Sequence, residues 1–250
     1  MSKNETLLTF TNASLKINDK MMISPFSLDI KKGDIILITG PNGCGKSTLI
    51  RMILGQESEQ IEFSRESVLY HGEEYSKNLS DFSELFSYAE QELPNNIAIS
   101  GMGACTAYLR SSYNSIDGKY KDYVRNLYTE YFKRNDDDKC SLLKKKLRHM
   151  SGGEKEKINL IRCLSRNSEL YFLDEPLNNL DTLTIKQFLE YIRLHQESTF
   201  VIVTHCHLFD KSLRDDQTQF RPYVIRNNEL IYDETYCSHT DCLGLHDFKL

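Results

Sequence analysis

The chain has 250 residues, 27 % of them charged and 40 % hydrophobic, with a formal net charge of −5 at pH 7. This predicts a globular protein with a substantial core, and the acidic balance argues against a nonspecific nucleic-acid binder, so no nucleic-acid partner is expected. No apolar run approaches the roughly 18 residues of a membrane-spanning helix, and the first residues lack a signal-peptide core. Seven cysteines without a C-x-x-C pair favour a reducing compartment, so we expect a cytoplasmic chain.

The N-terminal segment predicts an antiparallel sheet that leads into a buried strand. Short apolar stretches at 7–10, 14–17 and 26–30 are typical of strands, and the last alternates apolar and polar residues. Lys32-Gly33-Asp34 predicts a turn into 35–39, a β-branched apolar run that indicates a buried parallel strand.

A glycine-rich loop follows this strand directly. Gly40, Gly45, Lys46 and Ser47 satisfy the phosphate-loop pattern G-x-x-x-x-G-K-[ST], and apolar residues at helical spacing follow, up to a helix C-cap at Gly55. A strand, a glycine loop and a helix N-terminus direct backbone N–H groups at a phosphate. We therefore predict a nucleoside triphosphate site in which Lys46 reaches the β- and γ-phosphates and the Ser47 hydroxyl ligates Mg²⁺. The whole loop is expected to bind the nucleotide: Gly40, Pro41, Asn42, Gly43, Cys44, Gly45, Lys46, Ser47 and Thr48.

The middle of the chain changes in texture. Residues 56–81 are polar and loop-like with one possible strand at 67–70, and 85–89 predict a second core strand. Beyond residue 97, apolar and tyrosine residues at helical spacing predict a helical insertion that ends in the basic run 144–148. Its tyrosine stripe consists of Tyr123, Tyr128 and Tyr131. We assign the stripe to the insertion's core or packing seam, with partner docking as the alternative. The basic run is interpreted as a solvated helix end, with steering of ATP or contact with lipid headgroups as the alternative.

A second helix start is predicted at Ser151-Gly152-Gly153-Glu154. Ser151 is a good N-cap and Glu154 completes a capping box. Further on, the apolar stretches at 170–173 and 199–203 predict buried strands with a helix over 183–195 between them. Residues 223–225 and 230–232 flank two asparagines and predict a hairpin.

A metal site is the weaker interpretation of the C-terminal tail. Its cysteines and histidines follow one another closely, at Cys237, His239, Cys242 and His246. The spacing matches no zinc pattern, so we favour a polar surface tail.

Two acidic residues, Asp174 and Glu175, follow the strand at 170–173. A carboxylate at that place can hold the Mg²⁺ that Ser47 contacts, the arrangement called Walker B. Because adjacent residues at a strand end point in different directions, Glu175 can polarise an attacking water. Alone, an acidic pair only marks the end of a strand; beside a phosphate loop we favour the catalytic interpretation.

The order of these motifs along the chain resembles an ATP-binding cassette (ABC) ATPase. The pieces are the phosphate loop, Gln91, Met150–Glu154, Asp174-Glu175, Asn178–Asp181 and His205, and they cover nearly the whole chain. The resemblance implies an α/β P-loop NTPase with a RecA-like parallel sheet core, an N-terminal antiparallel β subdomain and a helical insertion subdomain. It implies a single nucleotide-binding domain over 1–250, with its core at 1–91 and 151–250 and the helical subdomain at about 92–150.

The resemblance also implies roles for single residues, with ATP and Mg²⁺ as the bound groups. Glu175, His205 and Gln91 would be catalytic, and Ser47, Gln91 and Asp174 would hold Mg²⁺. His205 would contact the γ-phosphate, and Gln91 would link Mg²⁺ and the attacking water to the helical insertion. The signature residues would cap the γ-phosphate of ATP bound to an opposite cassette, and Asp181 would lie in the loop that crosses the dimer seam. The signature residues that cap the phosphate would be Ser151, Gly152 and Gly153, and Glu154 beside them is also expected among the nucleotide-binding residues.

Two positions depart from the family pattern. Glu154 replaces the usual signature glutamine, and its carboxylate could weaken the contact with ATP. Ile17 stands where an aromatic residue normally stacks on adenine, so the base would be held by apolar contact only.

The family's composite site requires two cassettes, so the resemblance implies a homodimer or a heterodimer that ATP closes and hydrolysis reopens. We expect an ATP-hydrolysing subunit of an ABC transporter, peripheral on the inner face of the cell membrane, that drives a separate integral membrane permease. The alternative is a non-transport ABC ATPase with an assembly or scaffold role, such as iron–sulfur cluster assembly. An inactive regulatory cassette is disfavoured because Lys46, Asp174, Glu175 and His205 are all present.

Overall fold

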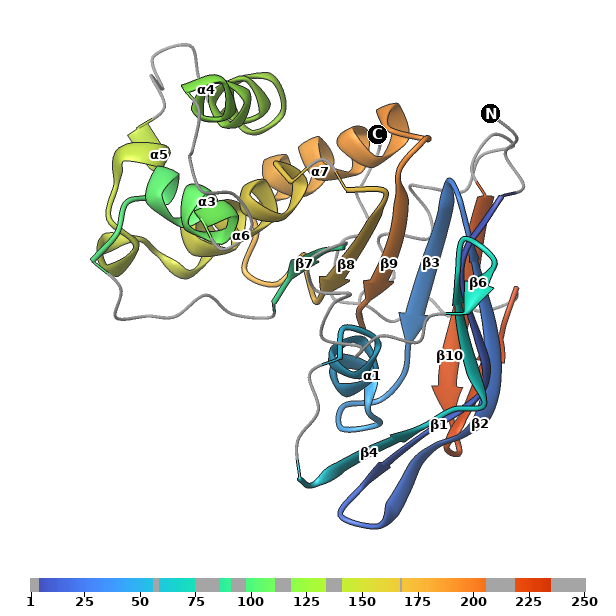
Figure 1. The fold of residues 1–250 in the computed structure, drawn as a ribbon. Helices are drawn as coiled ribbons and strands as arrows, with labels where there is room; N and C mark the ends of the chain where they lie inside the picture. The colour runs from blue at the N-terminus through green and yellow to red at the C-terminus, as the bar shows by residue number, and fades with distance from the viewer. Residues whose placement is uncertain are drawn as a thin grey trace.

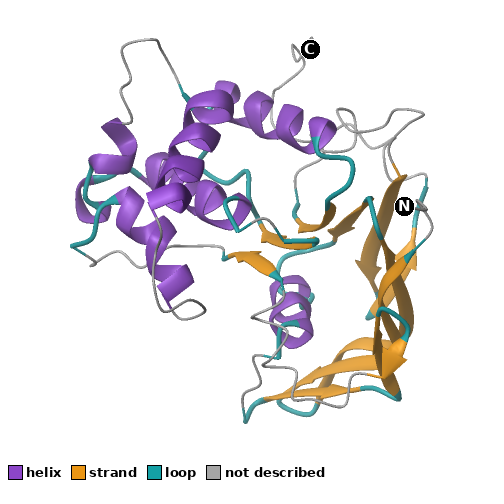
Figure 2. Cartoon of the chain, turned by 45° about the horizontal axis from the view of Figure 1, so that its top comes forward, coloured by secondary structure: helices purple, strands orange, loops and turns teal. Residues whose placement is uncertain are grey.

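The fold was determined as a computed structural model. It describes residues 5–55, 59–74, 86–90, 98–110, 118–133, 141–166, 168–205 and 219–234. A central sheet carries a helical lobe on one side and long antiparallel strands on the other (Figures 1 and 2). This is the arrangement of parallel core, antiparallel subdomain and helical insertion that the sequence predicts.

The central sheet has the strand order β11-β10-β3-β9-β8-β7. Its strands are β3 (Asp34–Thr39), β7 (Ser87–Ala89), β8 (Leu170–Asp174), β9 (Thr199–Val203), β10 (Gln219–Arg226) and β11 (Glu229–Tyr232). All neighbours pair in parallel except β10 and β11, which form the predicted hairpin; its turn residues Asn227 and Asn228 both have positive φ. The parallel register places the carboxyl ends of β3, β8 and β9 at one edge of the sheet.

The antiparallel sheet consists of β1 (Thr6–Ile17), β2 (Lys20–Lys31), β4 (Ile61–Ser64), β5 (Ser67–Tyr70) and β6 (Glu73–Glu74). The two short strands predicted at 7–10 and 14–17 are one strand, β1. Its pairing with β2 shifts register between Phe10 and Ala13, where Asn12 has a φ of 49°. A bulge adds an unpaired residue without ending the strand, which explains why the polar break misled the prediction. The loop-like interpretation of 56–81 was also incomplete, because β4 and β6 lie there as short edge strands.

Alternate residues of the core strands enter two separate hydrophobic clusters, one on each face of the sheet. In β8, Leu170 and Phe172 pack with α1 (Lys46–Ile53) and the antiparallel sheet. Tyr171 and Leu173 pack with α6 (Gly152–Leu164) and α7 (Thr182–Leu194). Both faces of the central sheet are therefore covered, which is why its strands read as continuous apolar runs.

The helical lobe contains α3 (Gly101–Arg110), α4 (Gly118–Leu127), a π-helical turn (Tyr128–Phe132), α5 (Ser141–Lys144) and a 3₁₀ turn (Leu147–His149). Within the described ranges, no helix is long and apolar enough to cross a membrane.

Tyrosine contacts join this lobe to α7. The ring of Tyr131 meets Tyr191 edge-on at a centroid distance of 5.0 Å, and Tyr191 stacks on His195 at 3.9 Å. Tyr128 is buried, whereas Tyr123 is 39 % exposed. Tyr128 and Tyr131 thus belong to a packing seam, as expected for most of the stripe.

A buried ion pair ties the start of β3 to β10. Asp34 is 1 % exposed, and its Oδ2 accepts hydrogen bonds from Arg221 Nη1 at 2.6 Å and from the Lys31 backbone N–H at 2.9 Å. Burial raises the pKa of Asp34, and these two donors offset that effect only in part. The carboxylate therefore depends on Arg221 to remain charged inside the protein.

We expect Arg221→Met to lower the free energy of unfolding by about 3 kcal/mol, because it leaves the buried Asp34 carboxylate without its counter-ion. Urea denaturation at neutral pH measures this. Arg226→Met, an exposed position in the same strand, is the control. Equal stabilities of the two variants would contradict a structural role for the pair.

Candidate functional site

The loop between β3 and α1 is shaped by its glycines. Gly40, Gly43 and Gly45 have φ angles of 147°, 78° and 102°, which L-residues with a side chain rarely adopt. A Cβ on Gly40 would also lie only 2.8 Å from the carbonyl oxygen of Ile225. The glycines of the phosphate-loop pattern are thus required by the backbone conformation of the loop.

Lys46 lies within the curve of this loop. Its side chain is buried, and Nζ donates to the carbonyl oxygens of Gly40 at 3.0 Å and Pro41 at 3.2 Å. The same residue begins α1, which has no acidic residue in its first turn. The ammonium group and the positive end of the helix therefore act at the same place, where an anion is stabilised.

Ser47 and Asp174 meet next to the loop. The Ser47 hydroxyl donates to Asp174 Oδ1 at 2.8 Å, and Asp174 is fully buried. Burial and the charge of the neighbouring Glu175 raise the pKa of Asp174, and the bond from Ser47 and the charges of Arg51 and Lys46 offset this only in part. Among the described residues, no donor reaches the other carboxylate oxygen, Oδ2, which is buried.

An unpaired buried carboxylate oxygen is costly unless a cation or a proton occupies it. Mg²⁺ binds hydroxyl and carboxylate oxygens and usually keeps few protein ligands beside those of a phosphate. Ser47 and Asp174 therefore fit Mg²⁺. The binding role itself stays a prediction.

Glu175 turns away from Asp174 and contacts His205. It has a φ of 52°, and its backbone N–H donates to the Val203 carbonyl at 2.8 Å. Glu175 Oε1 lies 2.9 Å from His205 Nδ1, and Oε2 accepts from the Thr204 hydroxyl at 3.1 Å. The sequence indicated Glu175 and His205 separately, and the structure shows them paired. The sequence analysis did not identify Thr204 as a partner of Glu175, because its only signal in the sequence is its place just after β9.

The signature segment forms the predicted capping box. Ser151 Oγ accepts from the Glu154 backbone N–H at 3.3 Å, and Glu154 Oε2 accepts from the Ser151 backbone N–H at 2.8 Å. A Cβ on Gly153 would lie 2.5 Å from the Asn179 carbonyl oxygen. The start of α6 and the segment 178–181 can approach this closely only with glycine at 153.

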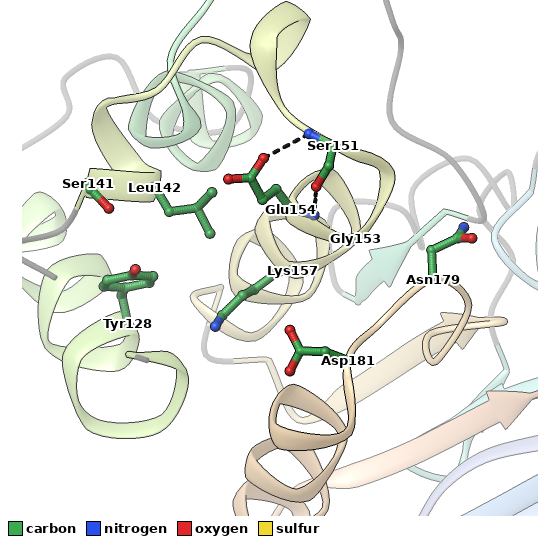
Figure 3. A pocket seen from close by; sticks show the side chains of 9 residues that line it. All are labelled: Tyr128, Ser141, Leu142, Ser151, Gly153, Glu154, Lys157, Asn179 and Asp181. Carbon is green, nitrogen blue, oxygen red and sulfur yellow. Dashed lines mark hydrogen bonds between the residues drawn. The ribbon is translucent and has the colours of Figure 1, made fainter. Parts of the chain in front are cut away.

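A hollow of about 390 Å³ lies beside this segment (Figure 3). Residues from the helical lobe, from α6 and from the segment before α7 line it: Tyr128, Ser141, Leu142, Ser151, Gly153, Glu154, Lys157, Asn179 and Asp181. Asp181 also caps α7, since its Oδ1 accepts from the Thr184 backbone N–H at 2.9 Å. The described residues that line this hollow include none from the phosphate loop, so one chain does not bring the two motifs together there.

Polar side chains of α6 and of Arg166, just after it, bind the backbone of residues 86–90, which include the edge strand β7. Arg166 and Arg162 donate to the carbonyl oxygens of Phe86 and Tyr88, at 2.6 Å and 3.3 Å. Asn159 Nδ2 donates to the Glu90 carbonyl oxygen at 2.5 Å. The helix that starts at the signature therefore holds the chain up to the residue before Gln91.

Some predicted residues cannot be placed. Gln91 lies outside the described residues, as does the tail from Cys237 to His246, so their roles stay predictions. Within the described ranges, no three His, Cys, Asp or Glu side chains gather as a metal site. Ile17 ends β1 and is half-buried, and its predicted place beside adenine also stays a prediction.

The geometry agrees with comparisons to known proteins. The family profile described as ABC transporter matches residues 23–178. The chain belongs to the ABC transporter ATP-binding family. It is 30 % identical over 205 residues to the uncharacterized ABC transporter ATP-binding protein YurJ of Bacillus subtilis, which covers 79 % of this chain and 52 % of YurJ. It is also 30 % identical over 194 residues to the sn-glycerol-3-phosphate import ATP-binding protein UgpC of Escherichia coli K12, covering 74 % of this chain and 49 % of UgpC. The ABC chain thus spans about half the length of these relatives.

Solved structures confirm the fold. An ATP-binding subunit of an ABC transporter superimposes with a TM-score of 0.72 at 20 % identity, over 90 % of this chain and 88 % of that one. A dimeric bacterial ABC transporter cassette gives a TM-score of 0.72 at 17 % identity, over 90 % and 96 % of the two chains. The predicted α/β P-loop fold of an ABC cassette is therefore correct.

We expect Asp174→Asn to keep the fold but to raise the Mg²⁺ concentration for half-maximal stimulation of nucleotide binding by at least about tenfold. The amide keeps the shape of the carboxylate but lacks its charge. Titration of Mg²⁺ against a fluorescent ATP analogue, with EDTA as the metal-free reference, measures this. Asp122→Asn, an exposed position on α4, is the control. An unchanged Mg²⁺ requirement would remove Asp174 from the metal site.

Proposed function

We propose that this chain is the ATP-binding and ATP-hydrolysing subunit of an ABC transporter, which pairs with a second cassette and drives a separate integral membrane permease. One observation carries the proposal: the ends of β3, β8 and β9 gather a phosphate loop, the Ser47–Asp174 pair and the Glu175–His205 pair. Membership of the ABC transporter family supports it.

In the proposed reaction, the backbone N–H groups of residues 40–48 and the Lys46 ammonium hold the triphosphate. Ser47 and Asp174 would hold Mg²⁺, which supplies neutralisation of the phosphate charge when bound. The predicted role of Gln91 at the metal and the water is carried over from the family resemblance.

Glu175 accepts a proton from the attacking water as the water oxygen bonds to the γ-phosphorus and the bond to the β-phosphate oxygen breaks. His205 and Thr204 orient the carboxylate through the bonds described above. Because Glu175 is buried and held from two sides, its side chain is fixed before substrate arrives, which reduces the reorganisation needed in the transition state.

Two features support pairing with a second cassette. The signature residues Ser151 and Gly153 line a hollow whose described lining residues include none from the phosphate loop of their own chain. A structural neighbour is a dimeric cassette. In the proposed dimer, ATP on one chain meets the signature of the other, and the partner can be a second copy or a related cassette. Hydrolysis then separates the pair, and the permease uses that movement.

We expect Glu175→Gln to bind ATP while its turnover falls by about a hundredfold or more, because the amide cannot accept the proton from water. The variant accumulates as a dimer with MgATP, measured by sedimentation together with phosphate release. Adding Lys46→Ala to this variant should abolish both nucleotide binding and the dimer. Turnover at the parental rate in Glu175→Gln would refute the assignment of Glu175.

The permease is tested with the same variant. Tagged Glu175→Gln protein with MgATP is purified from detergent-solubilised native membranes, and we expect a polytopic membrane protein to co-purify. Co-purification should fail without nucleotide. Recovery of soluble partners only, from cells whose membranes lack the protein, would contradict the transport role and leave the ATPase assignment intact.

A further inference from the structure

Glu154 occupies the signature position where the family usually has glutamine. The Glu154 carboxylate lies at the N-terminus of α6, in the hollow that Ser151 and Gly153 also line (Figure 3). We call this surface the signature face. The positive end of the helix would otherwise be offered to a phosphate. An uncompensated negative charge on Glu154 would repel the triphosphate of an opposing cassette.

The ammonium group of Lys145 contacts both oxygens of the Glu154 carboxylate. Its Nζ lies 2.7 Å from Glu154 Oε2 and 2.9 Å from Oε1, and Oε2 also accepts from the Ser151 backbone N–H. Although burial alone would raise the pKa of Glu154, the bonds from Lys145 and Ser151 lower it. The carboxylate is therefore charged, and the ammonium group compensates that charge in place.

The backbone fixes the position of Lys145. Its N–H donates to the Ser141 carbonyl at 3.0 Å, and its carbonyl accepts from the Gly101 N–H at 2.9 Å. These bonds hold it between α5 and the start of α3. Its neighbours Lys144 and Lys146 are exposed, while Lys145 is half-buried. One lysine of the basic run 144–148 is thus placed on Glu154, which corrects the interpretation of the whole run as a solvated helix end.

We propose that Lys145 is a positioning residue that neutralises Glu154 and so lets the signature face receive the triphosphate of ATP held by a second cassette. The inference rests on the proposed ATP-driven pairing. With glutamine at position 154 there would be no charge to neutralise. With glutamate there, a residue of the helical lobe, Lys145, supplies the compensating charge. The pair acts as one neutral unit, so the effect of removing Lys145 depends on the charge at 154.

The test is a double-mutant cycle in the Glu175→Gln protein, with the MgATP concentration for half-maximal dimerisation as the readout. We expect Lys145→Met to raise that concentration about tenfold or more, because the bare carboxylate opposes the phosphate. In the Glu154→Gln background the same substitution should change it by less than about twofold. The loss in Lys145→Met should shrink at high salt, which screens the exposed charges.

The controls separate charge from folding and from nucleotide binding. Lys144→Met and Lys146→Met remove neighbouring charges and should dimerise like the parent. ATP affinity of the dilute monomer should be equal in all variants, because Lys145 lies outside the phosphate loop. Rescue by Glu154→Gln excludes a merely structural effect, which the loss of a lysine anchor would cause in both backgrounds.

Three results would overturn the proposal. In the first, Lys145→Met dimerises like the parent; in the second, the double variant dimerises as weakly as Lys145→Met. Either result refutes the proposed role of Lys145 and leaves the proposed function of the chain intact. If instead the Glu175→Gln parent binds MgATP yet stays monomeric, the pairing on which both proposals rest fails.

Discussion

The hydrogen bond from Ser47 to Asp174 joins the two halves of the candidate site. Ser47 lies in the first turn of α1 and Asp174 ends β8, so the bond can form only when β8 and β3, separated by β9, are in register. It satisfies one oxygen of a fully buried carboxylate and leaves the other without a donor among the described residues. The cost of burying that oxygen is the physical reason that we expect a cation at this site.

The two apolar faces of the central sheet pack the parts of the molecule against one another. One face holds α1 and the antiparallel sheet, and the other holds α6, α7 and the helical lobe. Helix α6 contacts both the lobe and the core: its N-terminus carries the signature, while Arg162 binds the backbone of β7 and Asn159 binds the carbonyl of Glu90, just after that strand. The same helix therefore joins the signature to the end of β7 through its own backbone and these two side chains.

Charge is balanced differently at the two predicted phosphate-binding surfaces. At the phosphate loop, Lys46 and the start of α1 provide positive potential with no acidic residue in the first turn. At the signature, Glu154 contributes a negative charge that Lys145 offsets across the boundary between lobe and core. The charge of Glu154 is therefore offset only while the backbone of the helical lobe holds Lys145 in contact with it.

The sequence by itself determined the core strands, the phosphate loop, the capping box and the family, because each depends on contacts between residues close in the chain or on a backbone conformation that glycine alone adopts readily. It did not reveal that β1 is continuous through Asn12, because the pairing with β2 continues through a bulge at this polar break. It also could not show that His205 reaches Glu175 or that Lys145, among three adjacent lysines, reaches Glu154. Those pairings join residues on different strands and helices, and only the packing of these elements brings their charges within hydrogen-bond distance.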